Sequence, residues 1–111
     1  MEFKALQWSE DEATPLLEQY AFRDPKSDAI IVGTGTFRSG QRMPKEGFSS
    51  YGMREITVVL EGSIETRAGG QRTILRAGDI VTIPPGEQQV STFLEDTKLV
   101  YIFFGRALDP T

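Results

Sequence analysis

The chain has 111 residues, twelve of them basic and sixteen acidic, with a formal net charge of −4 and neither histidine nor cysteine. Its length suits one compact domain, and the negative charge without a basic cluster argues against nucleic-acid and anionic-membrane partners. Without cysteine and histidine, the chain cannot form disulfides, thiolate nucleophiles or iron–sulfur clusters, and it lacks the commonest zinc ligands and proton shuttle.

The first quarter of the chain, residues 1–28, is expected to form a short helical or extended arm that packs on the barrel or on a partner subunit. Ser9 and Glu12 have the spacing of a capping box for a helical turn. The apolar spacing after the first proline predicts a second short helix over 15–19. Asp-Pro-Lys-Ser at 24–27 predicts a turn.

From residue 29 to residue 104 the pattern changes to short β-rich runs that are cut by glycine and proline. Several short strands at near-regular spacing predict an all-β sandwich or small barrel. Residues 105–111 are expected to form a C-terminal tail. The predicted strands are 29–38, 54–60, 63–68, 72–76, 80–83, 88–94 and 97–104.

The run Leu99–Phe104, LVYIFF, is apolar on both faces of its predicted strand. A strand of this kind needs cover on both sides, and left bare it would favour aggregation. We therefore expect a homodimer. The run is too short to cross a bilayer, and the first residues lack the pattern of a signal peptide. We accordingly expect a cytoplasmic protein with no membrane partner.

Two motifs make the sequence similar to the cupin superfamily, whose members are small jelly-roll β-barrels. In REITVVLEG, six residues separate Glu55 from Gly62, and GDIVTIPPGEQQ carries Gly78 followed by a Pro-Pro-Gly corner. The fifteen residues between Gly62 and Gly78 lie within the family's range. The resemblance covers roughly 29–104 and implies a cupin-type barrel, in which both glycines would adopt positive φ.

The resemblance also shows which metal ligands are missing. The family's two histidines before the glutamate fall on Ser49 and Tyr51 with the shorter motif spacing, or on Phe48 and Ser50 with the longer. Its last histidine falls on Gln89. One carboxylate and one amide are poor ligands for a transition metal, so we expect neither a bound metal nor any other cofactor. The same loss makes the chain similar to the ethanolamine-utilisation Q type of cupin.

If Glu55 points into the barrel as its family counterpart does, strand alternation brings further side chains to the same cavity. An apolar pocket with a few convergent polar groups is typical of small-molecule sites. Near one barrel mouth, Arg38 is expected to attract an anionic ligand. The predicted ligand-binding residues are Ser49, Tyr51, Met53, Glu55, Gln89, Ser91, Phe93 and Arg38.

Three functions remain open from the sequence. The first is a metal-free cupin that binds a small carboxylate-like or sugar-like ligand. The second is a metal-independent isomerase or lyase with Glu55 as general acid and base and Tyr51 as electrophile, because burial raises the pKa of a carboxyl group. The third is a structural or accessory dimer whose barrel is filled by its own side chains, with Glu55 bonded to Gln89, Tyr51 or an arginine such as Arg54 or Arg38.

Overall fold

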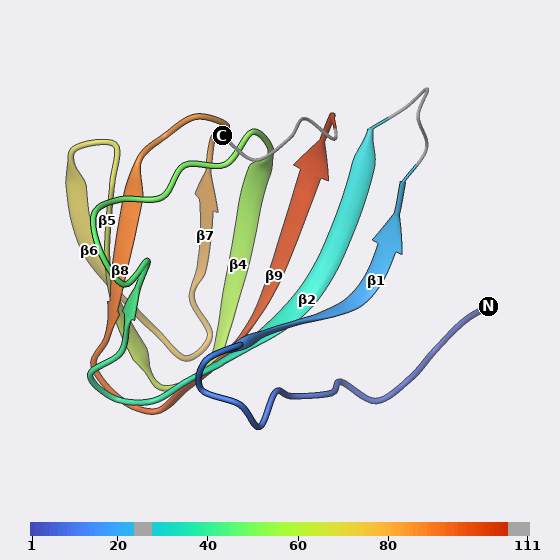
Figure 1. Cartoon of the computed structure of the whole chain (residues 1–111), viewed down its shortest axis with the longest axis horizontal. Helices are drawn as coiled ribbons and strands as arrows, with labels where there is room; N and C mark the ends of the chain where they lie inside the picture. Colours follow the sequence, from blue (N-terminus) through green and yellow to red (C-terminus); the bar gives the residue numbers. More distant parts are fainter. Residues whose placement is uncertain (24–27, 107–111) are drawn as a thin grey trace.

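The computed structural model describes residues 1–23 and 28–106, which form antiparallel strands in two sheets that face each other (Figure 1). The all-β prediction is confirmed, and no helix in the described residues is long and apolar enough to span a membrane. The strands are β1 (Leu16–Phe22), β2 (Ala29–Phe37), β3 (Arg42–Met43), β4 (Arg54–Glu61), β5 (Ser63–Ala68), β6 (Gln71–Arg76), β7 (Ile80–Ile83), β8 (Gln89–Phe93) and β9 (Thr97–Gly105).

One sheet has five strands in the order β1-β2-β9-β4-β7, and the other has four in the order β3-β8-β5-β6. A single glycine, Gly62, joins β4 of the first sheet to β5 of the second. It has a φ of 89°, and a Cβ atom there would lie 2.4 Å from the carbonyl oxygen of Asp96. Gly78 has a φ of 92°. Both glycines therefore adopt the predicted positive φ, a conformation that side-chain-bearing residues rarely adopt.

The hydrophobic core lies between the two sheets and draws residues from both. Val59 and Leu99 are neighbours on β4 and β9 of the larger sheet, and Ile64 and Phe93 are neighbours on β5 and β8 of the smaller one. All four are buried in one cluster. Their burial is what closes the barrel, because each sheet covers the apolar face of the other.

The predicted N-terminal helices are wrong. Residues 16–22 form β1, which pairs antiparallel with β2, and residues 12–14 form a turn. The sheet hydrogen bonds of β1 outweigh a weak helical pattern, since local propensity yields to tertiary pairing. The first sheet therefore begins at Leu16, inside the predicted arm of 1–28. The predicted turn at 24–27 and most of the predicted tail, 107–111, lie outside the described residues.

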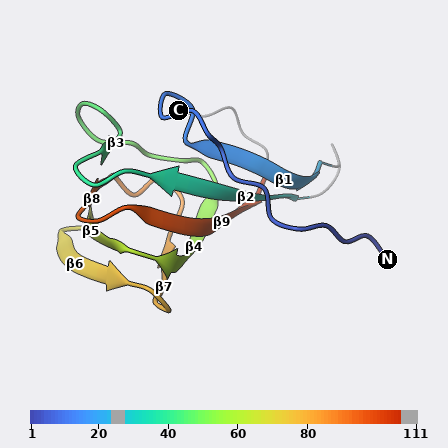
Figure 2. The same cartoon turned by 90° about the horizontal axis from the view of Figure 1, so that it is seen from below.

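The N-terminal segment before β1 crosses the outer side of the larger sheet. The side-chain amide of Gln19 bonds to the backbone of Gln7 twice, accepting from its N–H and donating to its carbonyl, both at 3.0 Å. The Thr34 hydroxyl donates to the same carbonyl at 2.6 Å. The Lys98 ammonium lies 5.0 Å from the centre of the Trp8 ring. In Figure 2 this segment runs past β1 and β2 and ends beyond the sheet.

Candidate ligand-binding site in the barrel

A cavity lies between the two sheets, and residues of both line it. The space open to the centres of water molecules measures about 60 Å³. A single water needs roughly 10–15 Å³ of such space, so the cavity has room for about four waters or a small organic molecule. Its polar lining consists of Ser49, Tyr51, Glu55, Thr57, Thr66, Gln89 and Ser91.

Glu55 is the one carboxylate in the cavity lining. It lies on β4 between Ile83 of β7 and Phe103 of β9, so its sheet neighbours on either side are apolar. Its Oε2 accepts a hydrogen bond from the Thr57 hydroxyl at 2.9 Å, and its Oε1 accepts one from the Gln89 amide at 3.2 Å. Burial raises the pKa of the Glu55 carboxyl, and these two hydrogen bonds lower it by less.

The smaller sheet supplies the polar side opposite Glu55. Ser49 and Gln89 exchange two backbone hydrogen bonds of 2.9 Å, which hold the Gln89 side chain at the strand start where it reaches Glu55. The hydroxyls of Thr66 and Ser91 form a hydrogen bond of 2.9 Å with each other, so each already has a hydrogen-bond partner. The polar lining is therefore a set of neutral donors and acceptors around one acid.

Aromatic rings form the wall beside Glu55. The centre of the Phe103 ring lies 5.0 Å from that of Tyr51 and 5.3 Å from that of Tyr101. Gly33 of β2 makes room for Tyr101, because a Cβ there would lie 2.1 Å from its ring. Burial raises the pKa of the Tyr101 phenol, with smaller contributions from Glu18 and Tyr51. Gly33 thus leaves room for the Tyr101 ring to lie against β2, which a side chain at this position would block.

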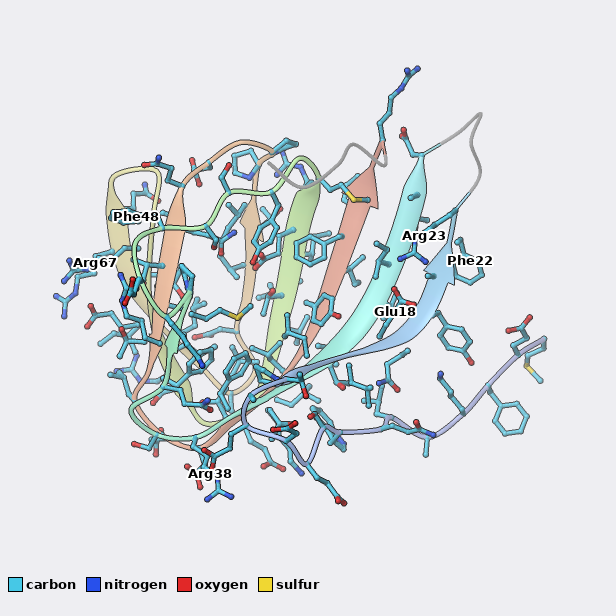
Figure 3. All side chains as sticks on the ribbon, viewed as in Figure 1. Glu18, Phe22, Arg23, Arg38, Phe48 and Arg67 are labelled. Carbon is cyan, nitrogen blue, oxygen red and sulfur yellow. The ribbon has the colours of Figure 1, made fainter. Side chains whose placement is uncertain are left out.

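Six of the eight predicted ligand-binding residues line this cavity: Ser49, Tyr51, Glu55, Gln89, Ser91 and Phe93. Met53 is not part of the lining, because β4 begins at Arg54 and strand alternation does not extend back to it. Arg38 is exposed, pairs with Glu12 and lies at the periphery of the barrel (Figure 3). The arginine partner considered for Glu55 is also absent among the described residues, since Arg54 donates to Thr82.

Several lining residues were not among the predicted ligand-binding residues. Thr66 and Leu75 come from β5 and β6, and Leu16 comes from the strand that was read as helix. Tyr101 and Phe103 were visible as alternate members of an apolar run, which marked them first as core residues. Strand alternation identifies the inner face of a strand, but only the pairing of the sheets shows which part of that face borders a cavity.

The positions at which metal-binding cupins carry their ligands do not fit a transition metal here. Around the cavity they hold a serine and a tyrosine, Ser49 and Tyr51, together with Glu55 and Gln89. The carboxylate and the amide are hydrogen-bonded to each other. Within residues 1–23 and 28–106, no group of three or more histidine, cysteine, aspartate or glutamate side chains could hold a metal ion. This donor set lacks the imidazoles or multiple carboxylates such metals prefer.

The model of the EutQ-like cupin domain matches residues 44–101, more than half of the chain. The chain belongs to this cupin family. The match spans β4 to β8 and the first part of β9, and so includes Glu55, Gln89 and the corner at Gly62. A comparison with curated proteins returned no match.

Solved cupin structures share the fold at low sequence identity. KdgF from Halomonas sp. is 20% identical, with a TM-score of 0.67 over 93% of this chain and 88% of that one. An RmlC-like cupin from Shewanella frigidimarina is 16% identical, with a TM-score of 0.67 over 96% of both chains. The EutQ protein of Clostridium difficile is 12% identical, with a TM-score of 0.61 over 93% of this chain and 83% of that one. At these identities the likeness establishes the cupin barrel alone.

Proposed function

We propose that this cupin binds a small organic molecule in its barrel without a metal. The observation that carries the proposal is the convergence of Glu55 from the larger sheet and Gln89 from the smaller one on a cavity with a mostly apolar lining. A few directed polar groups in an apolar pocket are how small-molecule sites are usually built. The presence of the cavity also argues against a barrel filled completely by its own side chains.

The cavity suggests a size for the ligand. Room for about four waters accommodates a molecule of only a few non-hydrogen atoms and is tight for a whole sugar ring. The lining residues contain no lysine or arginine. They therefore give no support to the carboxylate-like ligand expected from the sequence, because a buried carboxylate needs a cationic partner or several donors.

Native mass spectrometry of untagged protein tests the proposal. A histidine tag would add metal ligands that the chain lacks, so the tag must be absent. We expect the intact mass with a bound small organic molecule, or an adduct on addition of ligand mixtures. Adducts that persist when the cavity is filled by Ser91→Phe would contradict the proposal, because the ligand would then bind elsewhere.

A second function, proton transfer next to a carbonyl group, is favoured by one specific observation. Glu55 borders the cavity, and burial raises the pKa of its carboxyl, a shift in the direction that suits a general acid or base. Tyr51 is the candidate electrophile in the same lining. Once a ligand is known, Glu55→Gln separates the two functions. Lost turnover with retained binding supports catalysis, and unchanged turnover of a measured reaction contradicts it.

We also propose that the protein forms a homodimer through the outer face of the larger sheet. Strand alternation puts Ile56 and Val58 of β4 beside Ile102 and Val100 of β9 on this face. Ile80 on the neighbouring edge strand is 66% exposed. The centre of the face carries no charge, so two copies of it can meet without burying an unpaired ion. A large apolar patch of this kind marks an association site.

A further inference from the structure

The charge of Glu55 has no cationic partner among the described residues. Its two hydrogen-bond donors, Thr57 and Gln89, are neutral. The cavity lining includes no lysine or arginine. An ionised carboxylate in such a place is costly unless an opposite charge reaches it. The cavity therefore offers a negative site that a ligand can complete.

The nearest basic residue along the chain does not reach this site. Arg54 precedes Glu55 on β4, so its side chain lies on the opposite face of the sheet, where it donates to Thr82 at 3.0 Å. Arg42, on β3 of the smaller sheet, donates instead to the carbonyls of Pro44 and Gly47 at 2.7 and 2.8 Å. Because both arginines bond elsewhere, the Glu55 carboxylate can pair with a positively charged group of a ligand.

The aromatic rings beside Glu55 also favour a positively charged ligand. Phe103 is the direct neighbour of Glu55 on the adjacent strand, and its ring packs against those of Tyr51 and Tyr101. The faces of aromatic rings attract cations, particularly where the cation has lost its water. Alkylated ammonium groups suit an apolar, aromatic pocket better than an inorganic ion, which requires several oxygen ligands.

We infer that the barrel cavity binds a small organic cation of the alkylammonium class, with Glu55 as its counter-ion and the rings of Tyr51, Phe103 and Tyr101 as its wall. The inference rests on the proposed ligand-binding function and specifies the ligand class. The cavity volume of about 60 Å³ matches a compact ammonium group and little more.

The inference implies a pH dependence of binding. Burial raises the pKa of the Glu55 carboxyl in the free protein, and a bound cation favours the ionised form and lowers that pKa again. Affinity for the cation therefore increases as pH rises through the pKa of Glu55 in the free protein. The other titratable groups at the cavity are the phenols of Tyr51 and Tyr101, and the carboxylate of Glu18 on β1 acts on Tyr101 from beside it. A negative Glu18 adds to the preference for a cation.

Three probes of similar size and different charge test the ligand class. Tetramethylammonium, tert-butanol and acetate are titrated separately into the full chain, and methyl NMR resonances of the lining residues Ile64, Val81 and Ile83 report binding. We expect tetramethylammonium to bind at least about tenfold more tightly than either of the others. Equal or tighter binding of tert-butanol or acetate would overturn the ligand class while leaving the proposed ligand-binding function intact. No shift with any probe would overturn both.

A pair of variants tests the role of Glu55. Glu55→Gln keeps the shape of the side chain and removes its charge, so we expect it to weaken tetramethylammonium binding at least about tenfold and tert-butanol binding little. Glu61→Gln, on the exposed end of the same strand, removes the same charge outside the cavity and should change neither. Equal losses in the two variants, or none in either, would contradict the inference. The probe series on the unaltered chain stands independently of how either variant folds.

Discussion

On β4, Glu55 and Thr57 belong to the cavity lining, whereas Ile56 and Val58 lie on the other face of the same sheet. The inner face carries an acid, hydroxyl groups and aromatic rings around an open space. The outer face is apolar where β4 and β9 pair through Ile56 and Val58, and the N-terminal segment contacts the sheet at Gln19, Thr34 and Lys98. The two faces therefore suit different partners. The inner face suits a small polar ligand, and the outer face suits an apolar surface of another protein subunit.

The largest expected effect comes from crowding the inner face at Gly33. Gly33→Ala puts a methyl group 2.1 Å from the Tyr101 ring, so the ring or the strand must move. We expect a loss of about 2–3 kcal/mol in the free energy of unfolding, measured by urea denaturation. The added change Tyr101→Leu removes the atoms that clash and should make the double variant more stable than the sum of the two single effects.

Thr36→Val is the matched control for this experiment, on the same strand and the opposite face. The Thr36 hydroxyl is buried and has no hydrogen-bond partner among the described residues. Its loss should leave stability unchanged or slightly raised. If Gly33→Ala lowered the free energy of unfolding no more than this control, the packing of the Tyr101 ring against Gly33 would not stabilise the cavity wall.

The next largest effect concerns the outer face. Phe104 lies on β9 at 38% exposure, between Ile30 and Arg54 on the neighbouring strands. Phe104→Arg introduces an unpaired charge, so we expect the dimer dissociation constant to rise at least about tenfold. Light scattering with size-exclusion chromatography across a concentration series measures it.

Leu94→Arg is the control for the dimer. Leu94 is similarly exposed, at 43%, but follows β8 of the smaller sheet. This substitution adds the same charge away from the proposed interface and should leave association unchanged. A chain that is monomeric before any substitution, or equal dissociation in both variants, would contradict association through the outer face.

The smallest expected effect is the pH dependence of stability that the Glu55 carboxyl on the inner face produces. Because burial raises the folded-state pKa of Glu55 above its ordinary value of 4.5, the free protein is most stabilised by this group below that value. The stability is lost as pH rises through the folded-state pKa, and each unit of pKa difference corresponds to about 1.4 kcal/mol. Glu55→Gln should therefore be more stabilising, relative to the unaltered chain, at pH 8 than at pH 4. Thermal unfolding at both pH values measures the difference, and the opposite sign would contradict a raised pKa.

Much of the fold could be predicted from the sequence because the β-rich runs after residue 29 are short, regularly spaced and bounded by glycine and proline. The predicted runs 63–68 and 80–83 coincide with β5 and β7. β1 could not be predicted, because Leu16, Leu17 and Tyr20 repeat at helical spacing and only pairing with β2 selects the strand. Two-residue β3 is too short to produce a pattern.

The site could be predicted in part. The cupin motifs located Glu55 and Gln89, and the structure joins them by a hydrogen bond. The expected position of Arg38 near one barrel mouth suggested contact with an anionic ligand, but Arg38 follows the inward-facing Phe37 and therefore turns to the outside, where it pairs with Glu12. A ligand's charge depends on which side chains reach the cavity from several strands, and sequence spacing along one strand does not reveal that.

The most direct test of the account is an NMR titration of the Glu55 carboxyl group. The side-chain carboxyl carbons of glutamate are labelled with ¹³C, the signal of Glu55 is assigned by its loss in Glu55→Gln, and its pKa is measured with and without tetramethylammonium. The account predicts a pKa above 4.5 in the free protein that falls when the cation is added. A pKa at or below 4.5 that does not respond to the cation would contradict it.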